Sequence, residues 1–598
     1  GDEAATDAAF AAAALIEALD LVNNRVVANS METRGVLARF EDGRLHVAAN
    51  GQGPWGLRDV LVEKLRLDPG QVHVSTPDVG GGFGMKAVEY PEQIVCAHAA
   101  MQIGRPVKWI SERSEGIATD TMGRDHVTCA EAAFDAEGRL TAVRIKSIAA
   151  MGAYLSQFAA YIPSVLVSKV LTGVYDVQTY FFGVKGVFTN TTPTDAYRGA
   201  GRPEAIYVIE RLMDYAARAM GVDALELRRK NFIREFPYVS ATGEKYDVGD
   251  FDRVLDAALE KADVAGFPAR KQEAARRGKL LGLGVCYYIE SILGDQNETT
   301  RFDFAEDGGI DLYVGTQSNG QGHETVFAQF LNDRLGVPFG KIRLIQGDSD
   351  LIPAGGGTGG SRSVTMQGSS IWGAADEWIE RAKPFAAEEL EVAAADVIFE
   401  NGSFAVAGTD KRLDVMELTG RARAKGRADL LTESRENVVP GRSYPNGCHI
   451  AEVEVDPDTG VTSVVKYTVV DDFGVLMNPV LAEGQVHGGV VQGIGQAITE
   501  HTVWDEDGQL VSASFMDYAM PRATDVPMIP FHHEGVPSTA NVIGMKGCGE
   551  AGTVGACAAV VNGALDAVWD CGVRHVDMPL TPLRMWGWLH GADRVAAE

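Results

Sequence analysis

The chain has 598 residues, a length that indicates more than one domain, and a net charge of −28 that disfavours nucleic acid as a partner. Its seven cysteines include no CxxC pair, so the sequence carries no pattern of iron–sulfur or zinc ligands, and a reduced, cytoplasmic protein is expected. We find no uninterrupted apolar run long enough to predict a membrane span.

Helical and strand patterns alternate along the chain, which predicts an α+β fold. Residues 4–19 are rich in alanine and are predicted to be helical. Residues 57–67 are amphipathic and typical of a helix, and residues 72–75 are predicted to form a strand. Residues 203–219 begin with proline, which the first turn of a helix tolerates best. Residues 268–279 are polar, basic and rich in helix formers, which is typical of a connecting helix.

One pattern occurs twice. A Gly-Gln-Gly run at 51–53 is followed by a helical segment, a strand and a glycine run at 80–84. The same order recurs from the Gly-Gln-Gly run at 320–322 to the glycine run at 355–360. We therefore expect two related units that face one ligand. They divide the chain into a first domain at 1–265, a connector at 266–279 and a second domain at 280–598.

The glycine runs can approach a ligand closely with their backbone and can form anion nests from free N–H groups. The second run adds the hydroxyls of Thr358, Ser361 and Ser363 and the cation of Arg362, a combination that suits a phosphate or pyrophosphate. The alternative interpretation of the two glycine runs is that they form tight structural turns and bind no ligand. Neither run has the spacing of a dinucleotide-binding or P-loop motif.

Three glutamines lie in similar glycine contexts: Gln52, Gln321 and Gln492. An amide offers both a donor and an acceptor, so together they could hold a polar heterocycle and an oxo group without adding charge. Each taken alone could equally be a capping or surface residue. His323 could donate to a phosphate or could be a structural histidine.

Four motifs then occur in a fixed order along the chain. They are Gly80-Gly81-Gly82-Phe83-Gly84, Ala196-Tyr197-Arg198-Gly199-Ala200-Gly201-Arg202-Pro203-Glu204, Gly320-Gln321-Gly322-His323-Glu324 and Gly549-Glu550-Ala551-Gly552. The set resembles the molybdenum-binding large subunits of the xanthine dehydrogenase and aldehyde oxidase family, and more closely the carbon monoxide dehydrogenase-like ones. The resemblance implies two related cofactor-binding domains with the cofactor between them. It begins after the position of the family's amino-terminal hammerhead domain, which we expect to be absent.

The resemblance implies a molybdopterin cofactor, expected in its cytosine dinucleotide form. The pterin dithiolene would hold the molybdenum, with no direct protein ligand. Gln52 would approach the apical oxo ligand, and Glu550, Arg198 and Gln52 would be the catalytic residues. The cofactor would be bound by Gln52, Gly82, Phe83, Gly84, Arg198, Gly199, Gly320, Gln321, Gly322, His323, Thr358, Ser361, Ser363, Gln492 and Gly549.

The implied reaction is hydroxylation of an electron-poor carbon with water as the oxygen source, and Glu550 would be the base. Burial among glycines and apolar residues could raise its pKa. The alternative role for Glu550 is a first-turn acid or N-cap of the predicted helix 551–569. Arg198 could stabilise developing negative charge or orient the substrate. It could instead pair with Glu204 or Asp195.

Two positions restrict the substrate. Gly199 stands where carbon monoxide dehydrogenases carry a copper-binding cysteine, and Ala200 stands where purine-oxidising relatives carry an aromatic residue. Together they predict a roomier pocket for an N-heterocycle, another aromatic compound or an aldehyde. An aldehyde oxidase-like or carbon monoxide dehydrogenase-like activity is the alternative within enzymes, and a non-catalytic scaffold is the alternative outside them.

Electrons must leave the site after each turnover, and this sequence has neither iron–sulfur ligands nor a flavin fingerprint. The resemblance therefore implies an iron–sulfur small subunit and an FAD medium subunit as partners. A dimer of such heterotrimers is expected.

Overall fold

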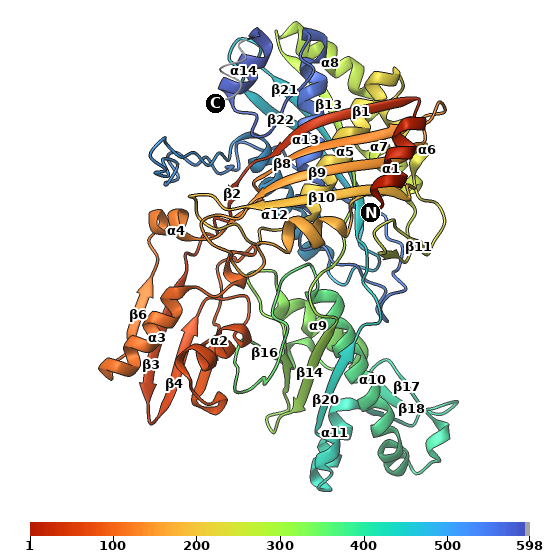
Figure 1. The fold of residues 1–598 in the computed structure, drawn as a ribbon. Helices are drawn as coiled ribbons and strands as arrows, with labels where there is room; N and C mark the ends of the chain where they lie inside the picture. The colour runs from red at the N-terminus through yellow and green to blue at the C-terminus, as the bar shows by residue number, and fades with distance from the viewer. Residues whose placement is uncertain (592–598) are drawn as a thin grey trace.

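The computed structural model describes residues 1–591. They form the expected α+β fold, with an upper lobe and two lower lobes (Figure 1). One sheet of the upper lobe has the order β1-β8-β9-β10, in which only β9 and β10 are parallel. Its strands are β1 (Leu15–Asn23), β8 (His126–Phe134), β9 (Leu140–Ala150) and β10 (Thr179–Val187).

The second sheet of the upper lobe has the order β13-β21-β22-β23. Its strands are β13 (Leu280–Ile289), β21 (Asn446–Val455), β22 (Thr462–Asp472) and β23 (Phe531–His533). The two sheets share one hydrophobic core, to which both halves of the chain contribute. Among the helices that contribute to this core are α5 (Arg202–Met220), α12 (Pro479–Ile498) and α13 (Ala551–Val568).

Helix α13 lies in close contact with β13. A Cβ at Gly284 would lie 1.9 Å from the carbonyl oxygen of Ala559, so only glycine allows this approach. Among the described residues, the segment Ala551–Cys571 is long and apolar enough to cross a membrane, which our reading of the sequence missed. Because 94% of its 18-residue apolar window is buried inside the protein, we interpret it as a core helix.

The lower lobes confirm the predicted repeat. Their sheets have the orders β5-β4-β3-β6 and β16-β15-β14-β20. In each, an antiparallel pair is followed by a helix and then by a strand parallel to the second member of the pair. The first lobe contains β3 (Gly35–Glu41), β4 (Arg44–Ala49), α2 (Trp55–Leu65), β5 (Val72–Ser75), α3 (Pro91–Ile103) and β6 (Val107–Ile110). The second contains β14 (Asn297–Phe304), β15 (Ile310–Val314), α9 (His323–Leu335), β16 (Ile342–Ile345), α10 (Ser363–Leu390) and β20 (Thr432–Val438).

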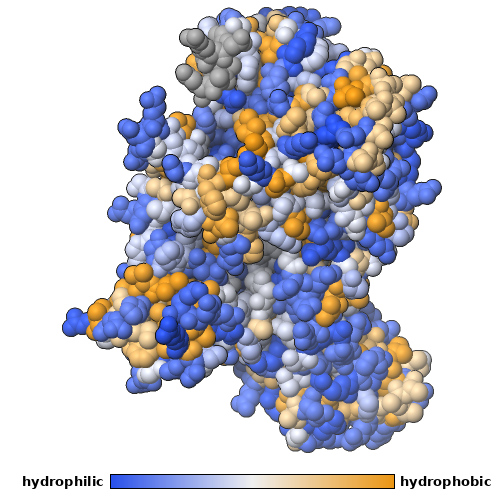
Figure 2. All heavy atoms as spheres, viewed as in Figure 1, coloured by the Kyte–Doolittle hydropathy of each residue, from blue (hydrophilic) through white to orange (hydrophobic). Residues whose placement is uncertain are grey.

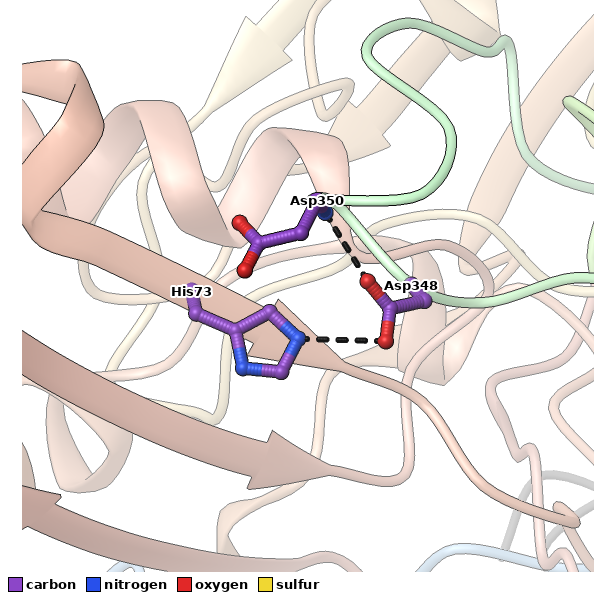
Figure 3. A group of neighbouring side chains, drawn as sticks. All are labelled: His73, Asp348 and Asp350. Carbon is purple, nitrogen blue, oxygen red and sulfur yellow. Dashed lines mark hydrogen bonds and ion pairs between the residues drawn. The ribbon is translucent and has the colours of Figure 1, made fainter.

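The two lobes meet just beyond β5 and β16. Thr76 N donates to Gly347 O at 2.7 Å, and His73 Nε2 lies 3.2 Å from Asp348 Oδ2. Figure 3 shows His73 pointing from β5 toward Asp348, with Asp350 beside them. One ligand atom of each of these three side chains lies within 4.8 Å of the others. Since Asp350 also pairs with Arg44 at 2.6 Å, we interpret the cluster as a polar connection between the lobes.

Of the five segments predicted from helix and strand patterns in the sequence, four are confirmed as helices or strands, and one is wrong in part. The strand at 72–75 is β5, and the helices at 57–67, 203–219 and 268–279 correspond to α2, α5 and α8 (Phe267–Arg276). The helix at 4–19 is wrong in its second half, because α1 (Glu3–Ala12) ends before β1 begins at Leu15. Pairing of β1 with β8 overrides the helical preference of alanine there.

The described residues contain further helices and strands outside the elements named above. They are β2 (Val26–Val27), α4 (Arg113–Thr119), β7 (Met122–Gly123), α6 (Ala224–Asn231), β11 (Tyr238–Val239), β12 (Lys245–Tyr246), α7 (Phe251–Lys261), β17 (Val397–Glu400), β18 (Ser403–Val406), β19 (Arg412–Asp414), α11 (Val415–Ala424) and α14 (Pro582–His590).

Candidate active site

A cavity of about 1000 Å³ lies where the three lobes meet. The surface is hollowed between the two lower lobes in the space-filling view (Figure 2). Gly199, Gly322 and Gln492 do not line the cavity. The other predicted site residues do: Gln52, Gly82, Phe83, Gly84, Arg198, Gly320, Gln321, His323, Thr358, Ser361, Ser363, Gly549 and Glu550.

Gln52 connects the two glycine loops. Its Oε1 accepts from Gly84 N at 2.9 Å, and its Nε2 donates to Thr358 O at 2.8 Å. The backbone carbonyl of Gln52 also accepts from Thr358 N at 2.8 Å. A primary amide has two N–H groups, so Nε2 keeps a second donor for a ligand.

The cavity wall leaves space for a ligand that carries polar groups. A Cβ at Gly320 would meet nothing within 4 Å, and one at Gly359 would meet only Gln52 Nε2, at 3.8 Å. Both glycines line the cavity and leave that space to a ligand. Asn319, also on the wall, has a buried Oδ1 without a hydrogen-bond partner. Ser361 adopts a φ of 58°, a conformation that is costly for a residue with a side chain and is common at functional sites.

Gln321 and His323 lie together at the start of α9. Gln321 Nε2 lies 3.0 Å from His323 Nε2 and 3.2 Å from Thr358 Oγ1. Burial lowers the pKa of His323 to about 3, so its ring is neutral at physiological pH. It can therefore offer a ligand a hydrogen bond but no positive charge.

Glu550 occupies the N-cap position of α13, but its side chain does not cap the helix. Oε1 accepts from Gly199 N at 2.7 Å, and Oε2 accepts from Arg202 at 2.5 Å and from Ser361 Oγ at 2.9 Å. Burial acts to raise its pKa, but Arg202 and the hydrogen bonds from Gly199 and Ser361 outweigh burial and hold the pKa below its ordinary value. Burial alone could have raised the pKa of Glu550, but these contacts lower it.

Arg202 and Glu290 are functional candidates that the sequence reading missed. Arg202 is fully buried and also donates to Glu290 Oε1 at 3.1 Å. Glu290 follows β13 directly, and burial raises its pKa to about 7 because Arg202 only partly offsets the burial and the charge of Glu550 adds to it. A carboxylate directly after an apolar strand is the signal in the sequence that could have identified Glu290.

Arg198 makes neither of the carboxylate pairs considered from the sequence. Its Nε donates to Gly549 O at 2.7 Å, and its other nitrogens donate to Gln485 O at 2.9 Å and Gln492 Oε1 at 3.2 Å. Within residues 1–591, no carboxylate oxygen lies within 4.0 Å of this guanidinium. Glu204 pairs instead with Arg124, at 3.3 Å. Arg198 therefore brings to the cavity wall a positive charge that no carboxylate contacts directly, although Glu550 acts on it from a longer distance.

Gly199 and Ala200 play different roles. A Cβ at Gly199 would lie 2.4 Å from Pro203 Cγ, so this position faces Pro203 and adds no room to the cavity. The expectation that both residues widen the pocket is wrong for Gly199. Ala200 does line the cavity, in an apolar cluster with Ile162, Leu166 and Leu293.

Two models of a molybdopterin cofactor-binding domain match the chain, at residues 1–232 and 257–527. The chain belongs to the molybdenum-binding large subunits of the xanthine dehydrogenase and aldehyde oxidase family. It is therefore part of a molybdenum-dependent oxidoreductase. The alternative role of Glu550, in which its side chain caps helix α13, is not supported because no such hydrogen bond forms.

Several relatives are similar over nearly the whole chain. The carbon monoxide dehydrogenase large chain of Hydrogenophaga pseudoflava is 34% identical, with 98% of this chain and 76% of the relative covered. The nicotine 6-hydroxylase large subunit of Paenarthrobacter nicotinovorans is also 34% identical, with 93% of this chain and 71% of the relative covered. The structure of quinoline 2-oxidoreductase from Pseudomonas putida 86 has a TM-score of 0.93 and 32% sequence identity. The match covers 98% of this chain and 77% of that protein's chain.

Proposed function

We propose that this chain is the catalytic subunit of a cytoplasmic molybdenum hydroxylase that oxidises an N-heterocycle, another aromatic compound or an aldehyde with water as the oxygen source. It passes electrons to an iron–sulfur small subunit and an FAD medium subunit, in a dimer of heterotrimers. The observation that carries this proposal is the position of Glu550, whose carboxylate lies on the wall of a cavity bounded by both glycine loops.

The cofactor would be molybdopterin cytosine dinucleotide. Gln52, Gln321, Thr358 and Ser363 line the cavity as neutral donors and acceptors for its pterin and phosphates. When bound, the cofactor would activate water and accept the two electrons taken from the substrate. The domains would span 1–265 and 280–598, joined by the connector 266–279 that contains α8.

Glu550 would accept the proton as the base of the reaction. Gly199 N, Arg202 and Ser361 fix its carboxylate in one orientation, so little reorganisation precedes proton transfer. Arg198, held by Gly549, Gln485 and Gln492, would stabilise negative charge that develops on the substrate. A positioned base contributes about 10²–10⁴ in rate.

The apolar part of the cavity wall favours a planar apolar substrate. Phe158 and Tyr161 line it together with the cluster around Ala200. The similarity to nicotine 6-hydroxylase and quinoline 2-oxidoreductase supports an N-heterocycle. Carbon monoxide oxidation is less well supported, because the copper-binding cysteine is replaced by Gly199, and an aldehyde is the second candidate.

The test is purification of the complex followed by molybdenum and pterin analysis and by assays against N-heterocycle and aldehyde panels. We expect about one molybdenum per chain and turnover of a heterocycle with an artificial electron acceptor. A matured complex without molybdenum and pterin would rule out the proposal and would favour a non-catalytic scaffold. Turnover of aldehydes alone would replace the heterocycle with the second candidate.

A further inference from the structure

Two carboxylates share one arginine and one hydroxyl beside the cavity. Arg202 donates to Glu550 Oε2 and to Glu290 Oε1. Ser361 Oγ lies 2.7 Å from Glu290 Oε1 and 2.9 Å from Glu550 Oε2. Glu550 has the role of base in the proposed function, while Glu290 is fully buried and does not line the cavity.

The hydroxyl of Ser361 carries one proton, so it can donate to only one of the two carboxylates at a time. Its oxygen also accepts from Glu550 N at 3.1 Å. If Glu290 is ionised, Ser361 can donate to it. If Glu290 carries a proton, it can donate to Ser361, which then donates to Glu550. The geometry therefore allows two hydrogen-bond arrangements that differ by one proton on Glu290.

We propose that Glu290 is the end point of a proton relay, in which a proton taken up by Glu550 passes through the Ser361 hydroxyl to Glu290. The bond between the proton and Glu550 Oε2 breaks as a new O–H bond forms on Ser361 Oγ. The original proton of Ser361 moves at the same time to Glu290 Oε1. No electrons are transferred, Glu550 is again ionised, and Glu290 is neutral.

The surroundings of the two carboxyls give the relay its direction. The contacts of Glu550 hold its pKa below the ordinary value, so it binds a proton weakly. Burial raises the pKa of Glu290 to about 7, and its Oε2 has no hydrogen-bond partner that would stabilise the ionised form. A proton on Glu550 therefore moves downhill to Glu290.

Few other titratable groups act on Glu290. Arg202 and Glu550 contact the same network, Arg198 lies farther away, and Tyr288 and Cys548 flank it. Burial raises the pKa of Cys548 to about 12 and that of Tyr288 well above its ordinary value, so both stay neutral near pH 7. Glu290 is thus the group of this network that titrates near neutrality.

This inference rests on the proposed function, but its first test does not depend on turnover. The complex as purified is titrated by infrared spectroscopy, which detects the carbonyl stretch of a protonated carboxyl. We expect a band with a midpoint near pH 7 that Glu290→Gln removes. Glu550→Gln should lower that midpoint, because it removes a neighbouring negative charge.

Glu500→Gln is the matched control. Glu500 is also buried, accepts from Tyr518 at 2.6 Å, and has a pKa that burial raises to about 7. We expect Glu500→Gln to remove a band of its own, with a midpoint that does not respond to Glu550→Gln. The inference would be overturned if Glu290→Gln left every titrating band of the parent in place, or if the only band it removed were the one that Glu500→Gln also removes.

The second test is the pH dependence of the single-turnover rate. The relay needs ionised Glu290, so the wild-type rate should fall as the pH decreases through about 7. In Glu290→Gln this acid limb should move to lower pH, and the rate should fall about 10²-fold, the lower end of what a positioned base contributes. An unchanged limb and rate would refute the relay.

Ser361→Ala keeps both carboxyls and tests the relay if Glu290→Gln does not fold. It should retain the Glu290 band but show the same shift of the acid limb to lower pH and the same fall in rate, and a wild-type profile would refute the relay. A complex without molybdenum would defeat the proposed function, whereas the infrared titration reports on the carboxyls alone. The two failures are therefore distinguishable.

Discussion

The substitution Gly199→Cys places a cysteine where carbon monoxide dehydrogenases carry their copper ligand, and we predict that it does not create a copper site. Gly199 has a φ of 100°, which costs about 1–3 kcal/mol for a residue with a side chain. The new Cβ would lie 2.4 Å from Pro203 Cγ and 2.7 Å from Pro203 Cδ, an overlap that typically costs a further 1–3 kcal/mol. The variant should therefore lose stability, and its thiol should face Pro203.

The assays are thermal inactivation of the purified complex, copper stoichiometry and labelling of the new thiol. We expect earlier inactivation, no stoichiometric copper and slow labelling. Ala200→Cys is the control, because position 200 lines the cavity and its thiol should be labelled readily. Gly199→Cys combined with Pro203→Ala should recover part of the lost stability. A Gly199→Cys protein that is as stable as the parent and binds one copper per chain would refute this reasoning.

Two further variants test other parts of the site. Gly359→Val should fold, since a Cβ there meets only Gln52 Nε2 at 3.8 Å, but it should contain far less molybdenum and pterin than the parent; a full complement of cofactor would contradict the proposed binding wall. Arg202→Met should destabilise the chain by about 3–5 kcal/mol, because it leaves two buried carboxylates without their cation. It should also raise the pKa of Glu550 and Glu290, so activity should disappear at a higher pH than in the parent; an acid limb at the parent pH would contradict the shared role of Arg202.

The sequence was informative where a local pattern determines local structure. The two Gly-Gln-Gly runs and glycine loops indicated a repeat, and the two lower sheets have the same topology. Val72–Ser75 was predicted as a strand with its observed bounds. Residues 15–19 were assigned wrongly, because their pairing with β8 depends on residues more than a hundred positions away.

The side-chain partners at the site could not be read from the sequence for the same reason. Arg202 and Glu290 are 88 positions apart and meet only because α5 and β13 share the upper core. Pairing with a nearby carboxylate was one of the two alternatives for Arg198, yet its partners lie on α12 and before α13. The direction of position 199 toward Pro203 follows from its positive φ, which residue type alone does not specify.

The central claim is that Glu550 is the base beside a bound molybdenum cofactor, and Glu550→Gln tests it most directly. Glutamine keeps the size of the side chain and can still accept from Gly199 N, so the cavity should persist. We predict that the purified complex retains the molybdenum and pterin content of the parent while turnover falls by about 10²–10⁴. Turnover close to that of the parent, at equal cofactor content, would contradict the claim.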